Sequence, residues 1–282
     1  MRYSLNAVYE VAGISKQAVL KYDREQSLWD ERVAALVADA DVLREAHPGC
    51  GIRKMYSILR PDFLGRDRFI ELMMSMDFGL KRTRKPHRTT IRSTARYPNL
   101  IRGMKVRSAG EIWQSDLTYY RIGGGHYYAV FIVDVYTKCI VGYQVSDNMR
   151  TKANKLALCQ AFAGFGAPKI HHSDRGTQYA SKEYTALLRS KEVEISMCDQ
   201  AYENSYAERI NGTIKGEYLD YWKPNTFAKL KRQTRAAVEN YNTKRPHDHL
   251  NGETPMGFHE RMLNTPLDER PLITIFDTEP EL

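Results

Sequence analysis

Three acidic residues, far apart in the sequence, stand where a metal-dependent reaction would need them. Asp116 lies in the middle of a predicted strand, Asp174 directly follows another, and Glu208 lies on a predicted helix. Side chains at strand ends gather at the ligand sites of α/β sheets. Converging carboxylates repel one another and raise their pKa values unless a cation joins them, and Mg²⁺ prefers oxygen ligands. We therefore expect these acids to be metal ligands.

The chemistry that such a site supports is phosphoryl transfer. Two Mg²⁺ ions roughly 3.5–4 Å apart stabilise both the attacking and the leaving oxygen of an in-line displacement, and no covalent nucleophile is needed. We expect Asp116, Asp174 and Glu208 to be the catalytic residues, with two ions per active site and Mn²⁺ able to replace Mg²⁺. A lone aspartate after a strand is more often a turn residue, so the prediction depends on the three acids acting together.

The helix expected over about residues 204–219 has two different faces. Its polar face holds Asn204, Glu208, Asn211, Gly212 and Lys215. Its opposite face holds Tyr206, Ile210, Ile214 and Tyr218. Because residues three, four and seven apart share one side of a helix, we expect the apolar face to pack on a sheet. Glu208 and Lys215, two turns apart, would then address one substrate.

Other titratable residues near these positions have competing interpretations. Asp134 ends a predicted strand, and we expect it to bond to the turn that follows, although a role as an auxiliary ligand stays open. Glu203 is an alternative to Glu208, but it falls near the apolar side of the helix. His171 and His172 are adjacent on a strand and point to opposite faces, so at most one faces the site. We expect them to pack in the core or to support a ligand residue, and not to be ligands themselves.

The positive charge is confined to one part of the chain. The net charge is +8, but residues 1–110 hold 21 Lys and Arg against 12 Asp and Glu, whereas residues 111–282 hold 21 against 22. A basic part joined to a nearly neutral part indicates a module that binds a polyanion, attached to something else.

A stretch without acids, residues 81–107, carries much of this charge. It has too few apolar residues to form a core, so we expect an extended linker that lies along a phosphate backbone, with a plain solvated linker as the alternative. The candidate DNA-binding residues here are Lys81, Arg82, Arg84, Lys85, Arg88 and Arg92.

The first 80 residues predict short helices and no strands. Residues 5–27 have the length and the helix-ending residues of a helix-turn-helix. Gly13 permits a turn, and Ser15 is a good N-cap for a second helix. Val19, Leu20 and Tyr22 of that helix would face inward. Further helices are expected over residues 31–46, 52–59 and 67–76, with "HPGCG" breaking the chain after the first of them.

After Ala109 the pattern becomes strand-rich. Three strands joined by short turns are followed by alternating helices and strands, in the order βββ-α-β-α-β-α. The expected strands are residues 111–122, 127–136, 139–146, 169–173 and 193–197, and the expected helices are 152–165, 182–188 and 204–219. An antiparallel start that continues through helical crossovers is typical of a ribonuclease H-like mixed sheet flanked by helices, an α/β fold.

Composition excludes several classes of protein. No stretch approaches the roughly 20 apolar residues of a membrane helix, and the N-terminus lacks the pattern of a signal peptide, so we expect a cytoplasmic protein. The four cysteines form no C-x-x-C pair, which favours buried thiols over a zinc site or a disulfide framework.

Four segments together resemble a known family. "WQSDLTYY", "HSDRGTQYAS", "ENSYAERINGTIKGE" and "YNTKRPHDHLNGETP" are similar, in this order, to the signatures of DDE transposases with an integrase catalytic core. The second-reading-frame (OrfB) product of the insertion sequence three family is the most similar type, and "HPGCGIRKMYSIL" resembles its N-terminal helix-turn-helix. The resemblance covers all but about the last 17 residues.

The resemblance implies roles for particular residues. The family's catalytic acids fall on Asp116, Asp174 and Glu208, and its basic residue that contacts DNA near the reacting end falls on Lys215. This chain departs in having 33 residues between Asp174 and Glu208, slightly fewer than usual, and Glu203 where the family has aspartate. The expected domains are a helical DNA-binding region (1–80), a basic linker (81–109), the catalytic core (110–264) and an acidic, loosely ordered tail (265–282).

The function that the resemblance implies is transposition of an insertion sequence. The enzyme would free a 3′-OH at each element end and join it to another phosphodiester, so its partners would be terminal inverted repeats and target DNA. A homo-oligomer on DNA, fusion to or association with the upstream reading-frame product, and no membrane contact are further expectations. The alternatives are a nuclease of the same fold that does not join, and a non-catalytic DNA-binding regulator.

Overall fold

A computed structural model describes residues 5–80 and 97–276, and it separates into two compact units. One unit comprises Met1–Ala46 and Gly51–Gly79, and the other comprises His47–Cys50 and Leu80–Leu282. The candidate DNA-binding residues between Lys81 and Arg92 lie outside the described residues.

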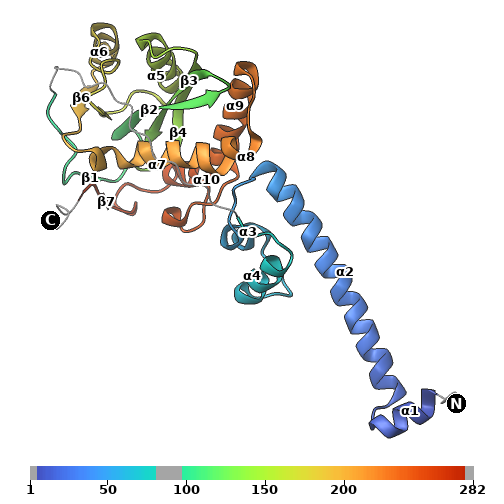
Figure 1. Cartoon of the computed structure of the whole chain (residues 1–282). Coiled ribbons are helices and arrows are strands. Elements are labelled where there is room, and N and C mark those ends of the chain that lie inside the picture. The colour runs from blue at the N-terminus through green and yellow to red at the C-terminus, as the bar shows by residue number, and fades with distance from the viewer. Residues whose placement is uncertain (1–4, 81–96, 277–282) are drawn as a thin grey trace. The chain divides into compact units, whose positions relative to one another are not determined.

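The described part of the first unit contains four helices and no strand, as the sequence predicted (Figure 1). Its small core is fully buried at Met55, Phe69 and Met73, with Tyr56 packed on Phe69 at 5.4 Å between ring centroids. The helices are α1 (Leu5–Ala12), α2 (Lys16–Ala46), α3 (Ile52–Leu59) and α4 (Arg66–Ser75).

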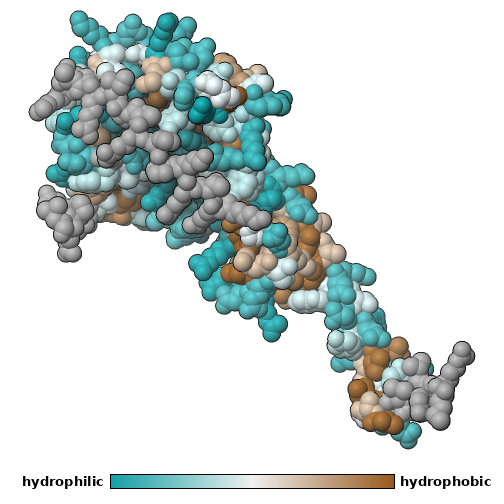
Figure 2. All heavy atoms as spheres, viewed as in Figure 1, coloured by the Kyte–Doolittle hydropathy of each residue, from teal (hydrophilic) through white to brown (hydrophobic). Residues whose placement is uncertain are grey.

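The expected helix-turn-helix over residues 5–27 is wrong in its packing. Ser15 does cap the second helix, since its Oγ accepts a hydrogen bond from Ala18 N at 3.1 Å. However, α2 continues for 31 residues because no glycine or proline interrupts it, and Leu20 and Tyr22 are 57% and 65% exposed. Figure 2 shows the resulting apolar surface on the N-terminal helices.

The second unit is built on a five-stranded sheet in the order β4-β3-β2-β5-β6. The pairs β2/β3 and β3/β4 are antiparallel, and β2/β5 and β5/β6 are parallel, which confirms the predicted mixed sheet. Its strands are β2 (Ile112–Ile122), β3 (Gly125–Asp134), β4 (Ile140–Ser146), β5 (Ile170–Ser173) and β6 (Glu194–Met197).

Helices cover both faces of this sheet. One face packs on α5 (Thr151–Phe165) and α6 (Lys182–Arg189), and Gly142 of β4 lets α5 approach so closely that a Cβ there would lie 2.3 Å from Ala157 O. The other face packs on α7 (Ser205–Thr213), the π-helix η2 (Ile214–Leu219) and α9 (Phe227–Thr243) through Ile210, Ile214 and Leu230, among others. The remaining elements are the 3₁₀-helix η1 (Ala201–Asn204), α8 (Asp220–Trp222), the 3₁₀-helix η3 (Asp248–Leu250) and α10 (Pro255–Leu263).

Two segments expected to be extended or loosely ordered are in fact part of the core. β1 (Lys105–Val106) pairs antiparallel with β7 (Ile273–Thr274), although one lies in the predicted linker and the other in the predicted tail. Ile101 and Ile275 are fully buried in a cluster with Phe258 and other apolar residues. The high charge of these two segments wrongly predicted that they would not pack, because a few well-spaced apolar residues are enough to anchor a segment on an existing core.

Within the described residues, no helix is both long and apolar enough to cross a membrane. The four cysteines are free thiols; Cys50, Cys139 and Cys198 are buried as expected, whereas Cys159 is exposed on α5.

Candidate active site

The register between β2 and β5 places Asp116 beside Asp174. The last parallel pair joins Ser115 to Ser173, and the two aspartates follow as the next residue on each strand. Neighbouring strands are about 4.8 Å apart, so both carboxyl groups leave the sheet at the same point. The two side chains are half-buried, and Asp174 Oδ1 accepts a hydrogen bond from Gly176 N at 3.0 Å.

Glu208 reaches the same place from α7, which polar side chains fasten to β2. Gln114 Nε2 donates to Glu203 O at 3.1 Å, and Gln114 Oε1 accepts from Tyr206 N at 3.1 Å. One turn after Glu208, Asn211 Nδ2 donates to Asp116 Oδ2 at 2.8 Å. The helix that carries Glu208 is thereby bonded to the strand that carries Asp116, and Glu208 itself is exposed.

The three carboxylates act on one another electrostatically. Burial, with the charge of Asp174 second and that of Glu208 also contributing, raises the pKa of Asp116 to about 8. Burial and the charge of Asp174 raise the pKa of Glu208 as well. These shifts are the ones expected for acids that converge without a counter-ion.

The carboxylate oxygens of Asp116, Asp174 and Glu208 are the type of ligand that a hard divalent cation prefers. Among the described residues, no three His, Cys, Asp or Glu side chains are arranged to hold a metal ion. Buried oxygens without a hydrogen-bond partner in the described structure add to the oxygen-rich character of the place: Oδ1 of Asn204 and Oδ1 of Asn211. Glu208 is exposed, so packing does not fix its rotamer and its carboxylate can turn toward an ion.

Lys215 lies on the π-helix that continues α7. Its Nζ donates to Tyr119 O of β2 at 2.9 Å and lies 5.0 Å from the centroid of the Tyr119 ring. Burial lowers the pKa of its ammonium group, and the charge of Asp220 opposes this shift. The switch from α- to π-helix changes the angle between Glu208 and Lys215 from the one predicted for a regular helix; the DNA contact of Lys215 stays a prediction.

Asp134 is structural, as its position in the sequence predicted. Its Oδ1 accepts from Thr137 N at 2.7 Å and from Thr137 Oγ1 at 2.9 Å, and its Oδ2 accepts from Gly110 N at 2.7 Å. The side chain is 2% exposed, and burial raises its pKa while these hydrogen bonds lower it. One oxygen is thus bonded to the turn after β3 and the other to the segment before β2, which supports the structural role of Asp134.

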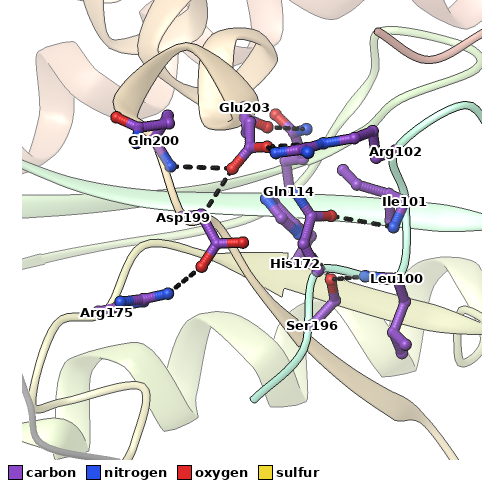
Figure 3. Close-up of polar contacts among 11 residues, drawn as sticks. Leu100, Ile101, Arg102, Gln114, His172, Arg175, Ser196, Asp199, Gln200 and Glu203 are labelled. Carbon is purple, nitrogen blue, oxygen red and sulfur yellow. Dashed lines mark hydrogen bonds and ion pairs between the residues drawn. The ribbon is translucent and has the colours of Figure 1, made fainter. Parts of the chain in front are cut away.

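Glu203 is likewise fully bonded, so it does not replace Glu208 (Figure 3). Its Oε1 pairs with Arg102, and its Oε2 accepts from Asp199 N at 2.6 Å and Gln200 N at 2.9 Å in a capping box. Burial opposes its ionisation, but Arg102 and the two amides hold its pKa below the ordinary value. Arg102, part of the basic stretch, thus forms an ion pair with a buried acid of the second unit.

His171 and His172 are packing residues, as expected. They are 1% and 0% exposed, with His171 Nε2 at 3.0 Å from Tyr184 OH and His172 Nδ1 at 2.8 Å from Ser196 Oγ. Burial lowers their pKa values to about 3 and about 4, so both rings are neutral at neutral pH.

Two residues of the site were missed or only partly recognised in the sequence. Gln114 fastens η1 and α7 to β2, and its position two residues before Asp116 on the same side of the strand was the available signal. Asn211 was placed on the polar face of α7, but its bond to Asp116 depends on the packing angle of that helix, which no sequence pattern fixes.

Comparison with known proteins identifies the second unit's family. The integrase core domain family matches residues 107–202, and a second family with the same description matches residues 192–255. The chain is 30% identical over 270 residues to the insertion element IS600 uncharacterized 31 kDa protein of Shigella sonnei, covering 89% of this chain and 97% of that protein. It is 32% identical over 221 residues to the transposase for insertion sequence element IS629 of Shigella sonnei, covering 76% and 74%.

A further relative is the putative transposase for insertion sequence element IS986/IS6110 of Mycobacterium tuberculosis, 30% identical over 73% of this chain and 79% of that protein. Among solved structures, the HTLV-2 integrase catalytic core domain in complex with magnesium aligns with a TM-score of 0.45 and 21% identity, covering 57% of this chain and 99% of that chain. The strand order and the registers of its sheet establish the fold of the second unit.

Proposed function

We propose that Asp116, Asp174 and Glu208 are the catalytic acids of this chain, which belongs to the DDE transposases with an integrase core, of the second-reading-frame type in the insertion sequence three family. Enzymes of this kind are polynucleotidyl transferases that cleave DNA and join the freed end to another strand. The observation that carries the assignment is the placement of Asp116 and Asp174 side by side at the end of β5, with the charge of Glu208 acting on Asp116.

Asp116, Asp174 and Glu208 would hold two divalent cations, Mg²⁺ or Mn²⁺, during the reaction. When bound, such ions stabilise charge on the attacking and leaving oxygens of a phosphodiester. Asn211 donates to Asp116 Oδ2 and the backbone of Leu117 also bonds to this carboxyl, and together they would orient it toward the ions. Because the pKa of Asp116 is raised to about 8, cation binding at neutral pH would expel a proton from this carboxyl.

The DNA partners would be the element's terminal repeats and a target duplex, with the protein acting as a homo-oligomer that joins two ends. Lys215 and the basic residues Lys81, Arg82, Arg84, Lys85, Arg88 and Arg92 are the proposed phosphate contacts. Replacing these six basic residues by glutamine should weaken binding and lower the slope of log K against log salt, by about 0.9 for each phosphate that the protein no longer neutralises. An unchanged slope, measured by fluorescence anisotropy, would make the segment a plain linker.

A joining assay tests the catalytic proposal. A labelled duplex with the element's own end sequence is incubated with a plasmid target, protein and Mn²⁺, and the products are separated by size. Wild-type protein should yield joined products, and Asp116→Asn, Asp174→Asn and Glu208→Gln should yield none while binding the duplex. Glu239→Gln, an exposed acid on α9, is the matched control and should join normally.

The same assay separates the alternatives. Cut but unjoined DNA would make the protein a nuclease of this fold, and bound but intact DNA would make it a regulator. Substantial joining by any of the three variants would remove that acid from the site.

A further inference from the structure

The short segment between α2 and α3 belongs to the catalytic unit. His47–Cys50 groups with the core, although the residues on both sides of it group with the helical unit. This "HPGCG" motif was predicted to belong to the N-terminal DNA-binding region. The C-terminal motif around Arg245 also has no part in the proposed chemistry, and both motifs meet at η2, the continuation of the helix that carries Glu208.

Gly49 makes the closest backbone contact in this junction. Its N donates to Glu217 O at 2.8 Å. A Cβ on Gly49 would lie 2.3 Å from Glu217 Cα and 2.7 Å from Glu217 O. Both atoms belong to the main chain of the π-helix, so neither can move aside as a side chain would. Any residue other than glycine must therefore push the segment away from η2 or distort the helix.

His47 adds a buried side-chain contact to the next residue of the π-helix. Its Nδ1 shares a hydrogen bond of 2.9 Å with Tyr218 OH, and the two residues are 4% and 0% exposed. Burial, with the positive charges of Lys244 and Arg245, lowers the pKa of His47 to about 4, so the ring is neutral. A neutral ring bonded to a hydroxyl is a stable buried pair, and it fixes the rotamers of both side chains.

Arg245 holds the same turn from another direction. Its Nε and Nη2 donate to the two carboxylate oxygens of Glu217 at 2.7 and 2.8 Å, and its guanidinium carbon lies 5.5 Å from the centroid of the Tyr241 ring. The Arg245 side chain is 10% exposed. A bidentate pair of this kind fixes orientation as well as distance. Glu217 is thus held at its main chain by Gly49 and at its carboxylate by Arg245.

The turn that these residues hold is unusual in itself. π-Helices are rare, tend to occur at functional sites and alter the angular position of the residues that follow. Here the π-helix begins directly after α7, which bears Glu208 and Asn211, and its Lys215 is bonded to β2. Fixing Glu217 and Tyr218 consequently fixes the end of the helix on which the third acid stands.

We propose that His47, Gly49 and Arg245 form a clasp on η2 that positions the helix of Glu208 against β2. They are positioning residues, since they act on Glu208 through the helix. The catalytic consequence of the clasp rests on the proposed role of Glu208, but its effect on the helix can be measured without any reaction.

Two neighbouring glycines provide the test. Gly49→Ala places a methyl group into Glu217, whereas Gly51→Ala meets nothing within 4 Å and has an ordinary φ of −71°. In hydrogen–deuterium exchange on the full chain, Gly49→Ala should speed the exchange of amides in residues 205–219 by about tenfold, with α5 unchanged, because the clasp restrains local opening. At saturating end-sequence DNA its joining rate should fall by about tenfold with DNA affinity kept, while Gly51→Ala should match wild type.

A second variant keeps the proposal testable if Gly49→Ala does not fold. Tyr218→Phe removes only the hydroxyl bonded to His47, and Tyr143→Phe on β4 is its matched control. Tyr218→Phe should speed exchange over residues 205–219 by a smaller factor, about threefold, and Tyr143→Phe should not. Exchange at 205–219 that equals wild type, or that rises equally in α5, would overturn the clasp. If wild-type protein joins no DNA, the proposed function fails and the exchange comparison still decides the clasp.

Discussion

The sheet of this protein carries two kinds of acid, and their surroundings separate them. Asp134 and Glu203 are buried with both carboxylate oxygens bonded to amides, a hydroxyl or an arginine. Asp116 and Asp174 are half-buried and Glu208 is exposed, and burial together with the charge of Asp174 raises the pKa values of Asp116 and Glu208. The first kind stabilises the fold, whereas the second kind retains the capacity to bind a cation. Partners, more than position on a strand, therefore distinguish a structural acid from a candidate catalytic one.

The largest expected effect is on catalysis, in a comparison of Asp116→Asn with Asp134→Asn. Loss of a metal ligand removes several kcal/mol of transition-state stabilisation, so Asp116→Asn should lower the joining rate by roughly a thousandfold or more. The folded fraction of Asp134→Asn should keep a rate within about tenfold of wild type, because Asp134 touches no reacting group. The rate is measured per folded molecule at saturating DNA; equal decreases in the two variants would erase the distinction.

The second expected effect is on stability, and here Asp134→Asn should be the more damaging of the two substitutions. In Asp134→Asn, an NH₂ group must face either Gly110 N or Thr137 N, both of which are donors. A buried donor left without an acceptor costs about 1–3 kcal/mol, so the free energy of unfolding should fall by that amount in urea denaturation. Asp116→Asn at pH 8 should show no such decrease. A destabilised Asp116 variant with a stable Asp134 variant would reverse the assignment of the two acids.

The smallest expected effect is the pH dependence of stability without divalent cations. Asp116 has a pKa of 3.8 when unperturbed and about 8 in the folded protein. Between these values the folded state keeps a proton that the unfolded state has lost, so wild-type stability should decline as pH rises through this window.

Asparagine has no proton to lose, so Asp116→Asn should become more stable relative to wild type as pH increases from 4 to 8. A gain of about 1–3 kcal/mol by pH 8 is expected, which is less than the full pKa difference implies because the Asp116 residue as a whole is only half-buried. Unfolding is measured at several pH values with EDTA present. A constant difference between the two proteins would mean that Asp116 is ionised throughout, as an acid without repelling neighbours would be.

The order of strands and helices could be predicted from the sequence because local signals agree with the fold. The turn after Ile122 joins two strands as expected, and the following strand ends at Asp134, two residues before its predicted end. The structural role of Asp134 followed from its place at the end of β3, beside a turn. The burial of both histidines followed from their adjacent positions on a short central strand.

What the sequence could not supply were contacts between distant segments. The commitment of Glu203 to Arg102 joins residues 101 positions apart, and the pairing of β1 with β7 joins the two ends of the core. The exposure of Leu20 and Tyr22 on α2 was missed because apolar residues at helical spacing do not show whether a partner covers them. The contacts of Gly49 and Arg245 with Glu217 of the π-helix also join distant segments, and no periodicity within the helix reveals them.

A crystal structure of the protein grown with Mn²⁺ at pH 8, with anomalous data to locate the metal, tests the central claim most directly. The account predicts an ion with oxygen atoms of both Asp116 and Asp174 about 2.1 Å away, and Glu208 turned toward the same place. Anomalous peaks at other sites only, with these three carboxylates still apart in Mn²⁺-saturated crystals, would contradict it.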